Sequence, residues 1–284
     1  MKFLVLGCNG MAGHMISLYL KEQGHDVLGF DRRPSSLIDS VVGDAMDAVF
    51  IKNLIGKNKY DSVINCIGLL NQFAENNKAG AAYLNAFFPH YLAELTDGTD
   101  TQIIHMSTDC VFSGKRGQYT EDDLRDGTTF YDRSKALGEL EDEKNITLRN
   151  SIVGPDINPK GIGLLNWFMQ QQGEVNGYTG AMWTGQTTLQ LAKTMEVAAK
   201  EKAHGLYNTV PDNSISKSNL LGLFNKYMRG DKIKINPVDK MAADKSLKRT
   251  RWGFTYKIPD YEQMIIELAD WMRKHKDLYP HYNL

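Results

Sequence analysis

The 284-residue sequence predicts an α/β fold, in which a doubly wound parallel sheet is joined to a smaller α+β lobe. Over residues 1–155, short apolar segments alternate with amphipathic helical segments, a pattern typical of parallel strands buried between two helix layers. A glycine-rich turn directly follows the first apolar segment. The alternation becomes irregular after residue 155, so we expect one domain over 1–155 and a second lobe over 156–284, interwoven with the first.

Each predicted strand of the first domain is short and apolar. We expect these strands over residues 2–7, 26–31, 61–68, 101–108 and 146–154. Between them we expect helices over residues 13–24, 48–59, 79–98 and around 130–139. In the second half we expect helices at the end of 155–175 and over 186–205, 216–228 and 261–275, with a strand over 205–210. Right-handed crossovers between parallel strands place helices on both faces of the sheet.

Composition and charge are those of an ordinary soluble protein. Hydrophobic residues make up 42% and the formal net charge is -1, so nothing indicates a nucleic-acid or membrane partner. No apolar run is long enough to span a bilayer, and the N-terminus lacks a signal-peptide cleavage pattern. Cys8, Cys66 and Cys110 and the seven histidines lack the spacing of a disulfide framework or a metal site. We therefore expect a cytoplasmic protein without a metal.

The turn after the first strand reads GCNGMAG and places glycines at positions 7, 10 and 13. Glycine permits a tight turn and lets backbone N–H groups approach a pyrophosphate, whose charge suits the N-terminus of the next helix. A tight strand–helix turn without a ligand would use the same glycines. Their place between a first strand and a helix, with a second strand beyond, favours a dinucleotide site in a Rossmann fold.

The second strand ends in GFDRR, and its last residues bear on the choice of cofactor. An acidic residue about 20 residues past the glycines commonly holds the adenosine ribose, so Asp31 favours NAD(H). Arg32 and Arg33 follow at once, and arginine can clamp the 2′-phosphate of NADP(H). A solvated loop would carry the same arginines. We favour NADP(H), with NAD(H) possible.

The stretch FYDRSKALGE places Tyr131 and Lys135 four residues apart, on one face of a predicted helix. A free tyrosine has a pKa of about 10, and an efficient acid needs a pKa nearer the working pH. In a partly dry site, a nearby ammonium would favour the phenolate by on the order of 4 kcal/mol, or roughly three pKa units. Lys135 would thus make Tyr131 a usable proton donor, although an exposed helix face would have the same spacing.

The predicted strand over residues 101–108 runs into MSTDCVFSG, which places two hydroxyl groups at its carboxyl end, on Ser107 and Thr108. Ligands of open α/β sheets sit at that edge. A hydroxyl there can hydrogen-bond a substrate carbonyl and hold it against the acid.

Several of these stretches together resemble the extended short-chain dehydrogenase/reductases. They are the glycine loop, NCIG of the third strand, STDCVFSG, YTEDD and YDRSKALGE. Within that superfamily the sequence is most similar to the dTDP-4-dehydrorhamnose reductase group, which acts on nucleotide-linked keto sugars. The resemblance is strong over residues 1–155 and weaker beyond, where KSL at 245–247 and the C-terminal helix also fit.

The resemblance implies a role for each matching residue. The catalytic residues would be Thr108, Tyr131 and Lys135, with Ser107 as the second candidate hydroxyl. The cofactor would be bound by Gly7, Gly10, Met11, Ala12, Gly13, Asp31, Arg32, Asp44, Ala45, Cys66, Ile67, Gly68, Asn85, Tyr131, Lys135, Asn150 and Ser151.

The sequence departs from the family pattern at three places. Asp132 stands where a glycine usually follows the tyrosine. The alanine-rich stretch after the third strand reads CIGLLNQ, so we expect a different sugar pocket. Sugar-nucleotide 4,6-dehydratases carry Asp-Glu after the threonine, whereas Asp109 is followed here by Cys110, which argues for carbonyl reduction. Asp109 would either contact the substrate beside Thr108 or brace the loop.

The second half offers further candidates for contact with the substrate. Trp183, in the polar and aromatic stretch over 177–188, would stack on a base or sugar, or would belong to a packed surface loop. The basic stretch over 245–252 offers Lys245, Arg249 and Arg251 to a diphosphate, although charge runs are usually solvated.

The resemblance implies NAD(P)H-dependent reduction of a nucleotide-linked keto-deoxyhexose, for the synthesis of surface polysaccharide precursors. Two other functions remain open: a nucleotide-sugar epimerase, and a non-catalytic NADP-binding regulatory subunit like that of methionine adenosyltransferase. A complete set of Thr108, Tyr131 and Lys135 weighs against the regulatory subunit. The protein would be a monomer or a homodimer.

Overall fold

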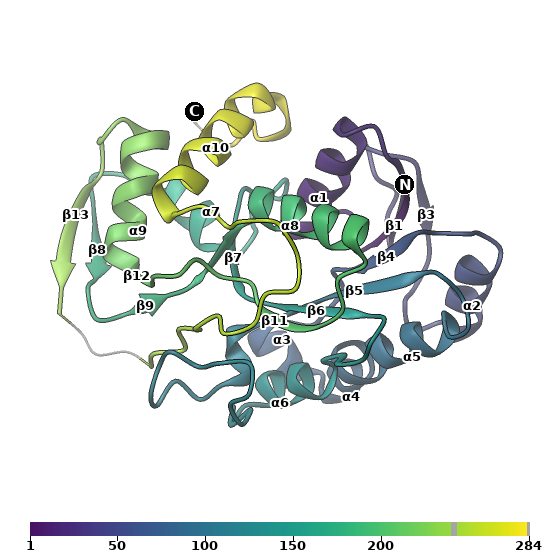
Figure 1. The fold of residues 1–284 in the computed structure, drawn as a ribbon. Helices are drawn as coiled ribbons and strands as arrows, with labels where there is room; N and C mark the ends of the chain where they lie inside the picture. The colour runs from purple at the N-terminus through teal and green to yellow at the C-terminus, as the bar shows by residue number, and fades with distance from the viewer. Residues whose placement is uncertain (240–242, 283–284) are drawn as a thin grey trace.

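The computed structural model describes residues 1–239 and 243–282. Within these residues, the central sheet has seven parallel strands in the order β11-β6-β5-β4-β1-β2-β3 (Figure 1). This is the strand order of a Rossmann fold with one more strand at the edge, and it confirms the predicted doubly wound sheet. The strands are β1 (Lys2–Leu6), β2 (Asp26–Asp31), β3 (Ser40–Val42), β4 (Ser62–Asn65), β5 (Gln102–Ser107), β6 (Ile146–Arg149) and β11 (Gly205–Asn208).

Helices cover both faces of this sheet (Figure 1). Helices α1 and α8 pack against each other on one face, and the segments from α2 to α6 cover the other. Their bounds are α1 (Met11–Glu22), α8 (Thr188–Glu201), α2 (Ala48–Gly56), α3 (Asn71–Asn76), α4 (Lys78–Ala81), the π-helical η1 (Ala82–Phe87), α5 (Phe88–Leu95), the 3-10 turn η2 (Asp109–Val111) and α6 (Phe130–Leu137).

Strand β1 illustrates why these strands are apolar throughout. Phe3 and Val5 belong to the core cluster that contains α1 and α8, whereas Leu4 and Leu6 belong to the cluster with α2 and α5. All four side chains are fully buried. Successive side chains of a strand point to opposite faces, so a sheet covered on both faces needs an unbroken apolar run.

Among the described residues, the smaller lobe is built from short strand pairs, three α-helices and the short helical segments η3 and η4. Strand β8 pairs in parallel with β13, β9 pairs antiparallel with β12, and β7 pairs in parallel with β10. The elements are β7 (Ser151–Val153), α7 (Leu164–Met169), β8 (Glu174–Tyr178), β9 (Met182–Trp183), β10 (Gly185–Thr187), β12 (Ile215–Ser216), α9 (Lys217–Phe224), η3 (Asn225–Arg229), β13 (Lys234–Val238), α10 (Tyr261–Lys274) and η4 (Lys276–Leu278).

The chain passes back into the large domain before it completes this lobe. Helix α8 packs on α1, and β11 then joins the sheet beside β6. The large domain therefore includes residues 188–208 as well as the segment before residue 155, and the lobe is made of two separate stretches of chain.

Helix α6, which carries Tyr131 and Lys135, starts at a capping box. The Thr129 hydroxyl accepts a hydrogen bond from Asp132 N at 3.0 Å, and the Asp132 carboxylate accepts one from Thr129 N at 3.2 Å. This reciprocal pair satisfies donors that the first helical turn otherwise leaves free. The family's glycine is thus replaced here by a residue that fixes the start of α6.

Gly138 lets the end of α6 lie directly against η1. A Cβ atom at this position would lie 1.9 Å from the carbonyl oxygen of Asn85, so one backbone would have to move. We expect Gly138→Ala to lower the free energy of unfolding by roughly 1–3 kcal/mol, as measured by urea denaturation.

The matched control is Gly222→Ala within α9, because a Cβ atom there meets nothing within 4 Å. Alanine is the better helix former, so this variant should gain about 0.5–1 kcal/mol. Equal unfolding midpoints for the two variants would contradict the close approach of α6 and η1.

Candidate active site

Two adjoining cavities follow the carboxyl ends of β1, β2, β4 and β5. The first has a volume of about 320 Å³ and the second about 480 Å³. Both are lined by Gly10, Cys66, Ile67 and Gly68, so they form one continuous groove. The groove crosses the sheet where the strand order reverses, between β1 and β4, which is where doubly wound folds bind their ligands.

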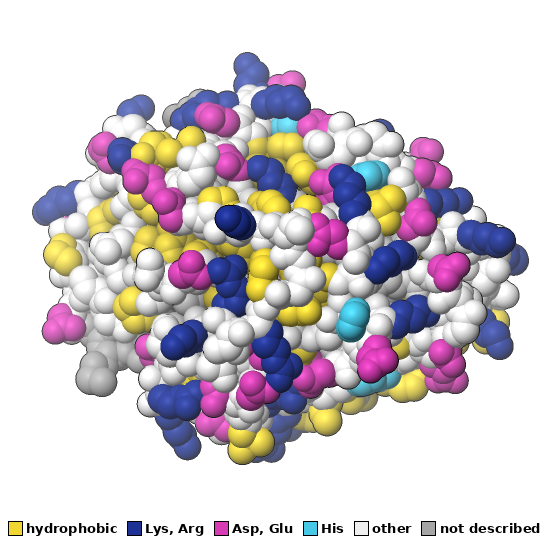
Figure 2. All heavy atoms as spheres, viewed as in Figure 1, with side chains coloured by type: hydrophobic (Ala, Val, Ile, Leu, Met, Phe, Trp, Pro, Cys, Tyr) yellow, Lys and Arg dark blue, Asp and Glu magenta, His cyan; other side chains and the backbone are white. Residues whose placement is uncertain are grey.

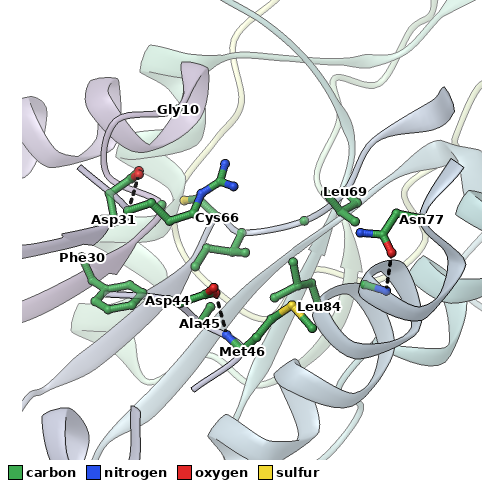
Figure 3. A pocket seen from close by; sticks show the side chains of 15 residues that line it. Gly10, Phe30, Asp31, Asp44, Ala45, Met46, Cys66, Leu69, Asn77 and Leu84 are labelled. Carbon is green, nitrogen blue, oxygen red and sulfur yellow. Dashed lines mark hydrogen bonds between the residues drawn. The ribbon is translucent and has the colours of Figure 1, made fainter. Parts of the chain in front are cut away.

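The first cavity has the residues expected for the adenosine end of a dinucleotide (Figure 3). The Asp31 carboxylate accepts hydrogen bonds from Arg32 N at 2.7 Å and Asn9 N at 3.1 Å. The Asp44 carboxylate accepts one from Met46 N at 3.0 Å. Of the predicted cofactor residues, those lining this cavity are Gly7, Gly10, Asp31, Arg32, Asp44, Ala45, Cys66, Ile67 and Gly68.

The glycine turn has the geometry that requires glycine at two places. Gly7 has φ +81°, in the left-handed region that side chains disfavour. A Cβ atom on Gly13 would lie 2.0 Å from the Gly7 carbonyl oxygen. The turn therefore brings the start of α1 against β1, and Met11, Ala12 and Gly13 line the second cavity.

The second cavity brings the predicted catalytic residues together. Thr108, Tyr131 and Lys135 all line it, although they come from the end of β5 and from α6. The Thr108 hydroxyl faces the same cavity as Tyr131 and donates a hydrogen bond to the Asp109 carboxylate at 3.0 Å. Asn150 and Ser151 line the same cavity.

Asp109 braces the loop in this structure. Its carboxylate accepts hydrogen bonds from Thr108 Oγ1 at 3.0 Å and from Ser151 Oγ at 2.7 Å. It thereby ties the end of β5 to the start of β7. Asp109 also lines the second cavity, so the same residue fixes the orientation of the Thr108 hydroxyl within the site.

The protonation of Tyr131 and Lys135 differs from the expectation. Burial raises the pKa of Tyr131, and the neighbouring Cys110 and Asp109 raise it further, whereas the Thr108 hydroxyl lowers it only in part. Burial also lowers the pKa of Lys135 to about 8. The Lys135 ammonium donates to the Met106 carbonyl at 2.7 Å. The expected lowering of the tyrosine pKa is therefore absent from the protein without ligands.

Asn150 is the residue of this cavity with free hydrogen-bonding capacity. Its side chain is 3% exposed, and neither its amide nitrogen nor its amide oxygen has a partner among the described residues. Buried polar groups normally have partners, so a ligand group with both a donor and an acceptor would fit here.

The Ser107 hydroxyl already has a buried hydrogen-bond partner. Its hydroxyl donates to the buried carboxylate of Glu139 at 2.5 Å. Glu139 in turn accepts from Arg149 Nη2 at 2.7 Å and Nε at 2.9 Å, and it also pairs with Arg125. Thr108 is therefore the strand-end hydroxyl available to a ligand.

Asn85 was predicted to contact the cofactor, but the structure places it outside the lining of both cavities. Its side chain is fully buried and lines neither cavity. The amide oxygen accepts from Leu69 N at 2.8 Å, and the amide nitrogen donates to Leu69 O at 2.9 Å and Ser134 Oγ at 3.1 Å. Asn85 thus fastens the loop after β4 to α6 from behind the groove.

The residues predicted in the second half to contact the substrate also line neither cavity. Trp183 is buried in the core of the lobe against Tyr261, with 5.7 Å between the ring centroids, and lines neither cavity. Lys245 Nζ lies 3.7 Å from the Asp132 carboxylate, and Arg249 pairs with Asp212 at 2.5 Å. Arg251 pairs with Asp122 and Glu141. All three cations pair with carboxylates, and none of them lines either cavity.

Sequence reasoning did not identify several residues of the groove. Apolar side chains such as Phe30 and Leu84 line the first cavity, and Asp156 and Ile162 line the second. Phe30 directly precedes Asp31 in the sequence, and this adjacency to a predicted cofactor residue could have indicated its place in the groove. Asp156 and Ile162 lie in the loop after β7, whose position depends on the lobe.

Residues 1–239 and 243–282 also bear on whether the protein has a metal-binding cluster, a membrane-spanning helix or a surface of one charge. They contain no group of three or more His, Cys, Asp or Glu side chains that could hold a metal ion. No helix among them is long and apolar enough to cross a membrane. Basic and acidic side chains are intermingled on the face shown in Figure 2, so that face has no field of one sign.

Comparisons with known proteins identify the family of this chain. The family model described as RmlD substrate binding domain matches residues 1–282. The chain belongs to this family. The RmlD family match extends over both lobes and confirms the resemblance to the dTDP-4-dehydrorhamnose reductase group.

Curated relatives match the RmlD-family chain over part of its length. The probable low-salt glycan biosynthesis reductase Agl14 of Haloferax volcanii is 34% identical over 48% of this chain and 46% of its own. The dTDP-4-dehydrorhamnose reductase of Aggregatibacter actinomycetemcomitans is 30% identical over 53% of this chain and 51% of its own. The chain thus spans about half the length of the curated relatives that it matches.

A solved structure supports the fold over nearly the whole chain. The dTDP-4-dehydrorhamnose reductase of Bacillus anthracis in complex with NADP has a TM-score of 0.78. The alignment covers 95% of this chain and 99% of that one at 18% identity. At such low identity, the match supports the fold alone.

The buried pair of Glu139 and Arg149 generates a stability prediction. Burial opposes the charge of Glu139, but hydrogen bonds and charge from Arg149 outweigh it and lower the Glu139 pKa. Glu139→Gln would leave the fully buried Arg149 without its counter-charge, so we expect a loss of roughly 3–5 kcal/mol in urea denaturation.

This loss should depend on pH with a definite sign. Because the folded-state pKa of Glu139 is lowered, its contribution is present above the ordinary carboxyl range and is lost as pH falls through the folded-state pKa. The difference between variant and wild type should narrow on acidification. Exposed Glu143 is the control, and a Glu143→Gln variant as unstable as Glu139→Gln would refute the explanation.

Proposed function

We propose that this protein reduces a nucleotide-linked keto-deoxyhexose with NAD(P)H, as a step toward surface polysaccharide precursors. The observation that carries the proposal is the single cavity lined by Thr108, Tyr131 and Lys135, which continues into the groove of the glycine turn. The names of the relatives support the substrate class, because they are reductases of dTDP-4-dehydrorhamnose and of glycan biosynthesis.

In the proposed reaction, the residues of this chain orient the carbonyl and supply its proton. The nicotinamide cofactor, when bound, supplies a hydride to the carbonyl carbon. The Thr108 hydroxyl turns from Asp109 to the carbonyl oxygen and donates a hydrogen bond that holds this oxygen near Tyr131, and Tyr131 transfers its phenolic proton to the oxygen. Charged Lys135 stabilises the phenolate that remains. Because the free tyrosine has a raised pKa, this stabilisation must be gained when the ligands bind.

Cys110 supports reduction over dehydration. It lines the cavity beside Thr108 and Asp109, where a dehydratase would use a carboxylic acid. Burial raises the pKa of this thiol to about 11, so it is a poor acid–base group at neutral pH. Net oxidation of NADPH with a panel of dTDP-, UDP- and GDP-linked keto sugars, followed by absorbance, separates a reductase from an epimerase or a regulatory subunit.

We also propose where the protein acts. Cys8, Cys66 and Cys110 are all free thiols, which suits the reducing cytoplasm. A monomer and a homodimer are both compatible with this function, and sedimentation distinguishes them.

Tyr131→Phe tests the role of the phenol, because it removes the proton and keeps the ring. We expect kcat to fall by roughly 10²–10⁴-fold while the Kd for NADPH stays nearly constant. Tyr60→Phe is the control. Tyr60 lies just before β4, at the amino end of that strand and not at the carboxyl end where the cavities lie. Its hydroxyl has no hydrogen-bond partner among the described residues. Unchanged turnover in Tyr131→Phe would rule out the proposed acid.

Arg32→Ala tests the preference for NADP(H). Arg32 lines the first cavity, whereas the next residue, Arg33, does not, and both are exposed. Loss of one charge-assisted contact to the 2′-phosphate should shift the kcat/KM ratio roughly tenfold toward NADH. Arg33→Ala should leave the ratio unchanged. An equal shift in both variants would indicate a diffuse charge effect rather than a contact.

A further inference from the structure

A buried histidine lies directly behind the catalytic lysine, and the proposed reaction does not use it. His105 is on β5 and is fully buried. Its Nε2 atom lies 3.4 Å from Lys135 Nζ, and its Nδ1 atom lies 3.2 Å from Asn65 Nδ2. Asn65, at the end of β4, is also fully buried. The side chains of Asn65, His105 and Lys135 thus form a continuous row of polar contacts that runs from β4 through β5 to α6.

The orientation of the Asn65 amide follows from its other contact. Its oxygen accepts a hydrogen bond from Ile67 N at 3.1 Å. A backbone N–H can only donate, so the oxygen must face Ile67 and the NH₂ group must face His105. The opposite orientation would place two donors against each other and leave the backbone N–H of Ile67 without this acceptor.

This orientation fixes the tautomer of His105. The Asn65 NH₂ group donates to Nδ1, so Nδ1 must present a lone pair. Burial lowers the pKa of His105 well below its ordinary value, so the ring is neutral and its one proton sits on Nε2. That N–H group faces Lys135 Nζ. An ammonium has no lone pair to accept it, whereas a neutral amine does.

We propose that Asn65 and His105 form a buried tautomer lock, which weakens proton binding by Lys135 and thereby sets the upper pH limit of the proposed reduction. The lock itself rests only on the contacts above. Its kinetic consequence rests on the proposed function, because charged Lys135 is the form that stabilises the phenolate of Tyr131.

Other groups around Lys135 act in both directions. Burial lowers its pKa to about 8, whereas the charges of Glu139 and Cys66 raise it. The Met106 carbonyl accepts a hydrogen bond in either protonation state. The remaining titratable groups on α6 and on the elements packed against it are Tyr131, Asp132 and Arg133 on α6 itself, Tyr83 on η1, Asp109 and Cys110 in η2, Glu75 on α3 and Lys78 on α4.

Two substitutions release the lock by different routes. In Asn65→Asp, both side-chain oxygens accept hydrogen bonds, so the His105 proton moves to Nδ1 and Nε2 accepts from the Lys135 ammonium. In His105→Gln, the amide can turn its oxygen toward Lys135. Both variants should raise the titration midpoint of Lys135, by on the order of one pH unit.

Nuclear magnetic resonance measures both parts without any turnover. Nitrogen-15 shifts of labelled histidine in the free protein should identify Nε2–H in the wild type and Nδ1–H in Asn65→Asp. Carbon-13 shifts of labelled lysine give the midpoint of Lys135, whose resonance is the one lost in Lys135→Met. The wild-type midpoint should lie near 8.

Matched controls use the same substitutions at exposed positions. Asn176→Asp and His204→Gln add the same charge or remove the same ring on the surface, and neither should move the Lys135 midpoint. An Nδ1–H tautomer in the wild type, or an unchanged midpoint in both lock variants, would overturn the proposal. His105→Gln keeps the test decisive if the buried charge of Asn65→Asp prevents folding.

Kinetics then tests the consequence. The kcat/KM profile of the wild type should fall above about pH 8, and the fall should move to higher pH with the Lys135 midpoint in both lock variants. An unmoved fall, despite a moved midpoint, would refute the link to reduction. A protein that shows the midpoint shift but reduces no keto sugar would refute the proposed function and still support the lock.

Discussion

The buried carboxylate of Glu139 is the contact on which the geometry of this site depends. It follows α6, and it is bound by Arg149 from β6, Ser107 from β5 and Arg125 from the loop before α6. One group thus ties the helix that carries Tyr131 to the strand that ends at Ser107, directly before Thr108. A buried charge is tolerated only when it is fully paired, and this one is paired twice. The catalytic residues are held in place by a contact that faces away from the groove.

Much of the fold and of the cofactor groove could be predicted because the signals were local. The glycine turn, the apolar strands and the Tyr131–Lys135 spacing each follow from a few adjacent residues and from the geometry of strands and helices. The rule that ligands of open parallel sheets bind at the carboxyl ends of the strands then predicted which strand ends form the site. This is why Thr108 and Tyr131 line one cavity despite their separation in the sequence.

The remaining positions could not be predicted because they depend on which partner a side chain finds. Asn85 follows the family pattern, yet its amide is taken up by Leu69 and Ser134. Trp183 and Arg249 have the chemistry of a nucleotide contact, but one is in the core and the other is paired on the surface. The pKa of Tyr131 is raised, although we expected it to be lowered, for the same reason: burial raises it, and the Lys135 ammonium is hydrogen-bonded to the Met106 carbonyl. Residue type and spacing do not encode these partners.

The return of the chain into the sheet bears on how the protein is made. Helix α8 and strand β11 are translated only after the first stretch of the lobe, yet α1 and β6 need them as neighbours. A nascent chain that ends near residue 155 would have an exposed edge at β6 and an uncovered apolar face on α1. Such surfaces attract other chains, so the newborn protein depends on rapid completion of its second half, or on a chaperone, to avoid aggregation.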